Sequence, residues 1–254
     1  MDVITLENLV FRPCYYGFKF GKHSRLVELQ KGHLYLKNLD FFIKEETRTG
    51  IKGVGDNEEA LLFSSSDVKA FDPNTHTLLF TGKAEVRNSG DIFKPVFCMT
   101  AKDIFQNPQS LDFPNLVTSI EFDTKLIEDF SNNAEKLYVL IITDIAEFIR
   151  RIELTLIPMN IILNYGLVKY RDTKVIWKTD NGIELNNAFC KNESYKHQEE
   201  FRILIETTVD DHFEININDI SDISSVVEAE NIIKHGLTID INITEIIELN
   251  EKDQ

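Results

Sequence analysis

The segment at residues 194–206 constrains the fold of this chain more than any other. The polar block Lys196–Glu200 runs directly into an apolar alternation of Phe201, Ile203 and Ile205. Unpaired charged groups are expensive to bury, so the charges of this block must be solvated, paired or lining a cavity. The chain must therefore build a strand that enters the core beside a concentration of charge.

Alternate residues of a strand share a face, which predicts how these side chains are sorted. Gln198, Glu200 and Arg202 point one way, and Phe201 and Ile203 point the other way. If the apolar pair faces the core, Glu200 and Arg202 lie together on the opposite side. Two interpretations follow: an exposed ion pair worth at most about 1 kcal/mol, or a cleft in which Glu200 bonds a sugar hydroxyl or stabilises developing positive charge.

The order of the predicted elements favours an α+β fold. Strand patterns outnumber helical ones, and several neighbouring strands look joined as hairpins, for example Phe201–Thr208 with His212–Ile217. Helical patterns include His23–Lys31 and Asp144–Leu156. No repeat or long linker divides the chain. We expect a single domain over residues 1–254, with a mixed, mainly antiparallel sheet flanked by a few helices.

The charge of the chain is concentrated near its C-terminus. The net charge is −15, from 27 basic and 42 acidic residues. Residues 206–254 hold 13 acids against Lys234 and Lys252, a net of −11, which leaves −4 for residues 1–205. An acidic region of this kind is either a solvated face or a surface for a basic protein partner. Free nucleic acid is not an expected ligand, because no basic surface is visible.

Cysteine usage and hydropathy point to the cytoplasm. Cys14, Cys98 and Cys190 are far apart in sequence and lack metal-binding spacing, which predicts buried, reduced thiols. No apolar run approaches the roughly 20 residues of a membrane span, and the N-terminus does not read as a signal peptide. The scattered histidines predict no metal site.

Two further segments carry candidate ligand-binding residues. Tyr16–His23 combines lysines, glycines and aromatic residues beside a helix start, a composition suited to an anion, while Tyr35 offers a ring for stacking. A buried aromatic strand with a solvated basic turn explains the same pattern. In the loop Gly53–Ala60, Asp56 is either a helix N-cap, with Glu58 and Glu59 in the first turn, or a residue that orders a ligand.

Four short motifs resemble a group of uncharacterised bacterial and phage proteins, some of them linked to abortive infection. The motifs are Phe18-Lys19-Phe20, Leu29-Gln30-Lys31-Gly32-His33-Leu34-Tyr35, Gly55-Asp56-Asn57-Glu58-Glu59 and Gln198-Glu199-Glu200-Phe201-Arg202. Their order is also similar to that of ADP-ribosyltransferase-type folds, although the usual Arg- or His-x-Thr opening is absent.

This resemblance implies a function in phage–host conflict, with NAD as the cofactor. It implies that Lys19 or His23 contacts the dinucleotide, that Tyr35 stacks on the nicotinamide, and that Glu200 orients the ribose as the catalytic residue. Arg202 and Asp56 complete the expected cofactor contacts. Transfer of ADP-ribose or cleavage of NAD is the enzymatic hypothesis. The alternative is a non-catalytic acidic protein from a phage or mobile element that binds a host or defence protein.

Overall fold

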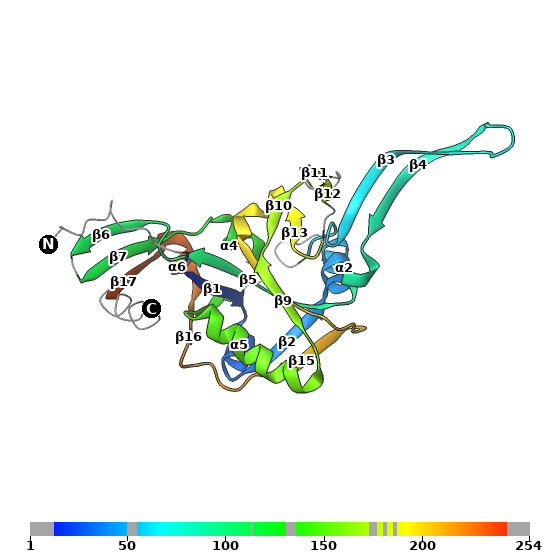
Figure 1. Cartoon of the computed structure of the whole chain (residues 1–254). Coiled ribbons are helices and arrows are strands. Elements are labelled where there is room, and N and C mark those ends of the chain that lie inside the picture. The colour runs from blue at the N-terminus through cyan, green and yellow to red at the C-terminus, as the bar shows by residue number, and fades with distance from the viewer. Residues whose placement is uncertain are drawn as a thin grey trace. The chain divides into compact units, whose positions relative to one another are not determined.

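The computed structural model describes residues 13–49, 55–112, 114–130, 136–172, 177–179, 182–184 and 187–242. The chain divides into two compact units, each built from discontinuous segments. Unit 1 takes its described residues from 1–32, 99–151 and 218–254, and unit 2 takes them from 33–98 and 152–217. Figure 1 labels most of the helices and strands.

Unit 1 is built on antiparallel strands. Strand β1 (Tyr15–Gly21) pairs with the end of β5 (Pro95–Asp103) and with β8 (Tyr138–Ile142), and β8 also pairs with β16 (Ser224–Glu228). A three-stranded sheet contains β6 (Pro108–Asp112), β7 (Asn115–Ile120) and β17 (Leu237–Asn242). The helices are α1 (His23–Gln30), α4 (Lys125–Phe130), α6 (Ala229–His235) and α5 (Ile145–Leu156), whose last residues fall in unit 2.

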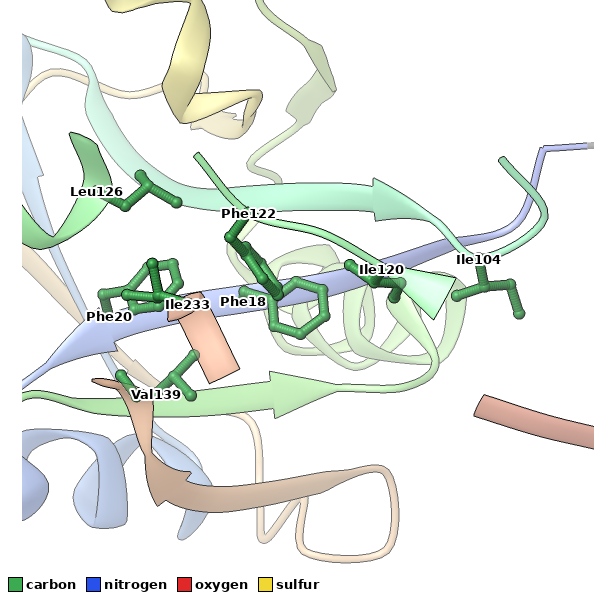
Figure 2. Close-up of a cluster of buried hydrophobic side chains, with 9 residues drawn as sticks. Phe18, Phe20, Ile104, Ile120, Phe122, Leu126, Val139 and Ile233 are labelled. Carbon is green, nitrogen blue, oxygen red and sulfur yellow. The ribbon is translucent and has the colours of Figure 1, made fainter. Parts of the chain in front are cut away.

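The core of unit 1 follows from the aromatic alternation in β1. Phe18 and Phe20 lie on one face of the strand and both are buried, as period-two alternation requires. Phe18 packs edge-to-face on Phe122, with ring centroids 4.9 Å apart. Leu126 and Val139 extend the same cluster (Figure 2).

Unit 2 contains the predicted charged strand. Strand β14 (Glu200–Ile205) pairs with β5 and β9 (Leu163–Leu167), while β2 (His33–Asn38) pairs with β15 (His212–Asn216) and β5. Small sheets join β10 (Lys169–Arg171) to β13 (Cys190–Asn192) in parallel and β11 (Trp177–Thr179) to β12 (Gly182–Glu184). The helices are α2 (Leu39–Thr49), α3 (Ser89–Ile92), and the 3-10 helices η2 (Ile157–Met159) and η3 (Glu193–Gln198).

A long two-stranded ribbon extends from unit 2. It consists of β3 (Leu61–Phe71) and β4 (Leu78–Arg87), paired antiparallel. Its turn lies away from the other elements of this unit (Figure 1). Asp72 fixes that turn, because its Oδ1 accepts hydrogen bonds from the backbone N–H groups of Asn74 and Thr75, both at 2.8 Å.

The α+β class with a mixed, mainly antiparallel sheet is confirmed, but one hairpin prediction is wrong. Strands β14 and β15 follow each other in sequence yet pair with different strands. Every residue of β14 is buried, so it needs partners on both sides, whereas β15 alternates between exposed and half-buried residues and borders β2 alone among the described strands. Of the predicted loop Gly53–Ala60, residues 53 and 54 lie outside the described part.

Two expectations from composition have mixed outcomes. Cys190 is buried and Cys98 is half-buried, but Cys14 is exposed, so its predicted burial is wrong. It lies at the surface, one residue before β1 begins, and does not join the apolar cluster of that strand. In the described residues, every helix is too short or too polar to cross a bilayer.

Candidate functional site: a buried ionic network

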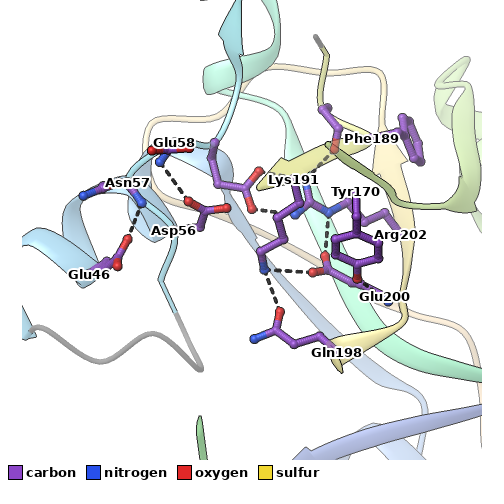
Figure 3. Close-up of polar contacts among 12 residues, drawn as sticks. Glu46, Asp56, Asn57, Glu58, Tyr170, Phe189, Lys191, Gln198, Glu200 and Arg202 are labelled. Atoms are coloured by element: carbon purple, nitrogen blue, oxygen red, sulfur yellow. Dashed lines mark hydrogen bonds and ion pairs between the residues drawn. The ribbon is translucent and has the colours of Figure 1, made fainter. Parts of the chain in front are cut away.

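Arg202 lies at the centre of a buried ionic network in unit 2 (Figure 3). Its side chain is 1% exposed. Nε donates to Glu200 Oε1 at 2.5 Å, while Nη2 and Nη1 donate to the two carboxylate oxygens of Glu59 at 2.5 and 2.7 Å. Nη1 also donates to the backbone carbonyl of Ala188. The guanidinium therefore binds two carboxylates at once, one of them in the bidentate geometry that arginine favours.

Lys191 is the second cation of the network. Its Nζ lies 3.0 Å from Glu200 Oε2 and donates to Gln198 Oε1 at 2.8 Å. It also lies 4.6 Å from the ring centroid of Tyr195, within the range of a cation–π contact. Both carboxylate oxygens of Glu200 are thus bound by cations.

The pKa values of Glu200 and Lys191 follow from this pairing. Burial alone would raise the pKa of Glu200, but Arg202 and Lys191 hold it well below its usual range. Burial would lower the pKa of Lys191, and Glu200 and Glu59 more than offset that effect. Glu200 and Lys191 are therefore both charged at neutral pH and compensate each other inside the protein.

The chain entering β14 explains why Glu200 and not Glu199 joins the network. Glu199 adopts a left-handed conformation, φ 42°, where η3 ends. The regular strand begins only at Glu200, whose backbone N–H donates to the hydroxyl of Tyr170 at 2.8 Å. Strand alternation then places Glu200 and Arg202 on one face, as the sequence predicts.

Asp56 lies in the same region and carries a buried carboxylate oxygen without a hydrogen-bond partner in the described part of the chain. It is 1% exposed, and its Oδ1 accepts a hydrogen bond from the Glu58 backbone N–H at 2.8 Å. Its buried Oδ2 has no hydrogen-bond partner among the described residues. Burial, followed by the nearby charge of Glu59, raises the pKa of Asp56 to about 7. This carboxyl group therefore titrates near neutrality, whereas the pKa of Glu200 is held low.

The network holds the root of the β3–β4 ribbon. Glu59, which is bound by Arg202, lies two residues before the start of β3. From the last position of β4, Arg87 donates to the backbone carbonyls of Glu59 and Asn57 at 2.8 and 2.6 Å. The Asn88 backbone N–H donates to the carbonyl of Ala60 at 2.9 Å. Both ends of the ribbon are thus tied to the segment that carries Glu59.

A second layer of contacts fixes the same segment to its surroundings. Asn192 Nδ2 donates to Glu58 Oε2 at 2.9 Å. Glu46 on α2 accepts from the Asn57 backbone N–H at 2.5 Å and from the Tyr195 hydroxyl at 3.1 Å. Gly55 packs so closely on α2 that an added Cβ would lie 2.3 Å from the backbone N of Glu46. The Gly-Asp motif is therefore a packing requirement of this junction.

Only some of the predicted site residues come together. Glu200, Arg202 and Asp56 share the network region, and the alternative of an exposed Glu200–Arg202 pair is wrong, because both side chains are buried. The helix N-cap predicted for Asp56 is also wrong, since residues 57–60 form turns leading into β3. This segment is instead held at Arg202 by the carboxylate of Glu59.

The remaining predicted residues belong to other elements of the fold. Tyr35 on β2 is 42% exposed and stacks on His212, with ring centroids 4.9 Å apart. Lys19 on β1 and His23 at the start of α1 belong to unit 1, where the exposed His23 ring packs against Tyr138 at 4.7 Å. The expectation that these three residues share a cleft with Glu200 stays a prediction.

Sequence reasoning missed the roles of Glu59 and Lys191. The sequence pattern predicts Glu59 in a first helical turn, yet its side chain is 3% exposed and binds Arg202. Lys191 directly follows Cys190, which is buried, and stands at the start of a charged block. That position is the sequence signal that could have indicated a buried lysine. The described residues contain no group of three or more side chains arranged to hold a metal ion.

The chain was compared with protein-family models, with curated proteins and with solved structures, and none of them matches it.

Proposed function

We propose that this chain is a binding protein that presents the β3–β4 ribbon to another protein chain. The observation that carries the proposal is a set of large apolar side chains exposed near the turn of the ribbon. Leu79 is 62% exposed, Phe80 60% and Phe71 52%, with Leu78 beside them. Contiguous exposed apolar residues on a protein surface mark an interaction site.

Two properties of the ribbon support this function. The turn is closed by hydrogen bonds: Asp72 accepts from two backbone N–H groups, and its own N–H donates to the carbonyl of Thr77 at 2.9 Å. The root is held by the ionic network through Glu59 and Arg87. A binding element that is already ordered loses less conformational entropy when its partner arrives.

The acidic C-terminal region gives less support to a charge-driven surface. Its described residues divide between the two units, and several acids have basic partners within their own unit. Asp211 pairs with Lys37 at 2.5 Å and Asp222 with Arg151 at 2.5 Å. We therefore place recognition on the apolar ribbon. The phage–host context and the cytoplasmic location remain part of the proposal.

NAD-dependent transfer receives less support than binding. The Glu200 side chain is 7% exposed and both of its oxygens bind cations, so orienting a ribose would require breaking a buried ion pair. Incubation with NAD tests this directly: we expect no release of nicotinamide. If the wild type releases nicotinamide and the Glu200→Gln variant does not, while circular dichroism shows that the variant is folded, the enzymatic hypothesis would be favoured over binding.

Site-specific photo-cross-linking tests the binding function. A photoreactive residue at Leu79 should give covalent adducts with a protein chain in the producing cells. The matched control is the same residue at Lys44, an exposed position on α2 of the same unit. Adducts at equal yield from both positions, or from neither, would contradict recognition through the ribbon.

A further inference from the structure

The two open edges of the ribbon differ, and the difference indicates which strand could pair with a partner. In the described part of the chain, β3 and β4 pair only with each other, so each has an open edge. Most of the register shifts are extra residues in β3, between Leu61 and Phe63 and between Ser65 and Val68. Bulges protect an edge from pairing with another strand. From Phe80 to Arg87 the β4 strand has no extra residue, and its edge is suited to pairing.

The backbone of β4 sets which groups reach that edge. The N–H of Asn88 donates to Ala60, on the side of β3. Because backbone direction alternates along an antiparallel strand, the N–H and C=O groups of Lys83, Glu85 and Arg87 point to the open edge. Side chains alternate as well: Phe80, Gly82, Ala84 and Val86 line one face, and Thr81, Lys83, Glu85 and Arg87 line the other.

The charge pattern of this edge is self-complementary. An antiparallel copy of β4 centred on Ala84 places Lys83 opposite Glu85 in both directions. On the apolar face it sets Val86 opposite Gly82, where an added Cβ would meet only Phe80 at 4.0 Å, so a valine from a second strand has room. Phe80 then lies diagonal to that valine, within reach of a cross-strand contact. The backbone directions above supply hydrogen bonds between Lys83 and Glu85 of opposite copies.

Overall charge also favours a second copy at this place. The ribbon, residues 61–87, contains three acids, Asp67, Asp72 and Glu85, and three bases, Lys69, Lys83 and Arg87, for a net charge of zero. The whole chain carries −15. Two copies that meet through their ribbons therefore bring together the neutral part of a strongly acidic protein.

We propose that the ribbon binds a second copy of this chain by antiparallel pairing of β4 with β4, forming a four-stranded sheet across a two-fold axis at Ala84. This proposal rests on the binding function above and names the partner. The Lys83–Glu85 and Glu85–Arg87 contacts within one copy, at 2.5 and 3.2 Å, are then joined by equivalent contacts between copies.

Charge reversal with complementation tests the pairing in the full chain. Sedimentation velocity of the wild type should show a species of twice the 29.3 kDa chain mass that dissociates on dilution. Lys83→Glu places two carboxylates opposite each other across the pairing, and Glu85→Lys places two lysines together, so each should raise the dimer Kd at least tenfold. An equimolar mixture of the two variants, or the double variant, should restore association.

Matched controls lie on the protected strand. Asp67→Lys and Lys69→Glu change the same charges on β3 and should leave the dimer Kd within about twofold of the wild type, a difference well under 1.4 kcal/mol. A wild type that stays monomeric to about 100 µM, or a dimer unchanged by both β4 reversals, would overturn the proposal. If the Leu79 probe still captures a different protein, the binding function survives while self-pairing fails.

Discussion

At the scale of single residues, the main finding is that Arg202 is a structural cation. It binds Glu200 and Glu59, whose side chains are both buried. Removing one partner from such a network leaves an uncompensated charge, which is more costly than losing an exposed pair. Glu200, which looks catalytic from the sequence, is therefore held by Arg202 and Lys191. Both cations would have to release it before it could bind a substrate.

Substituting Arg202 should destabilise the protein strongly. Arg202→Met retains much of the side-chain volume but leaves two buried carboxylates with Lys191 alone, and we expect a loss of about 3–5 kcal/mol in the free energy of unfolding. The matched control is Arg48→Met, which removes an exposed pair with Glu45 and should change it by less than about 1 kcal/mol. Urea unfolding measures both, and similar losses would contradict a buried network.

Asp56 should make stability depend on pH. Its pKa is about 7 in the folded state against 3.8 ordinarily, so its contribution is fully present below pH 3.8 and is lost as the pH rises through 7. Asp56→Asn cannot titrate. We expect the wild type to lose stability relative to this variant between about pH 4 and 7, with Asp56→Asn the more stable at pH 8. A stability difference that does not change with pH would refute this assignment.

At the scale of elements, the sequence predicted what depends on local pattern. The helices α1 and α5, predicted over His23–Lys31 and Asp144–Leu156, and the aromatic strand β1 are confirmed. The shared face of Glu200 and Arg202 follows from alternation and is also confirmed. What could not be predicted depends on pairing between distant segments: Glu59 meets Arg202 from 143 residues away, and β14 pairs with β9, not with its neighbour β15.

The junction between Gly55 and α2 gives a test of close packing. Gly55→Ala would put a Cβ 2.3 Å from the Glu46 backbone N, so the segment carrying Asp56 must shift, and we expect a loss of about 1–3 kcal/mol. Gly166→Ala on β9 is the control, because nothing lies within 4 Å of its added Cβ. Thermal unfolding compares the two variants, and an equal effect would argue against a tight junction.

At the scale of the whole molecule, composition does not predict where the acidic residues or the exposed apolar residues lie in the fold. The acidic C-terminal region looked like one surface, yet its described residues contribute to two compact units and pair there with bases from earlier in the chain. The ribbon was not singled out from sequence, because its alternating apolar residues have the pattern of any half-buried strand. Only the structure reveals that no described element covers them.

The ionic network anchors the root of the β3–β4 ribbon through Glu59 and Arg87. Amide hydrogen exchange on Glu59→Gln tests this most directly. Weakening the Glu59–Arg202 pair should speed exchange of the Asn88 amide, at the ribbon root, at least about tenfold, or about 1.4 kcal/mol of local opening. The Phe148 amide on α5, which donates to Asp144 in unit 1, should be unaffected. Unchanged protection of Asn88 would contradict the anchoring role of the network.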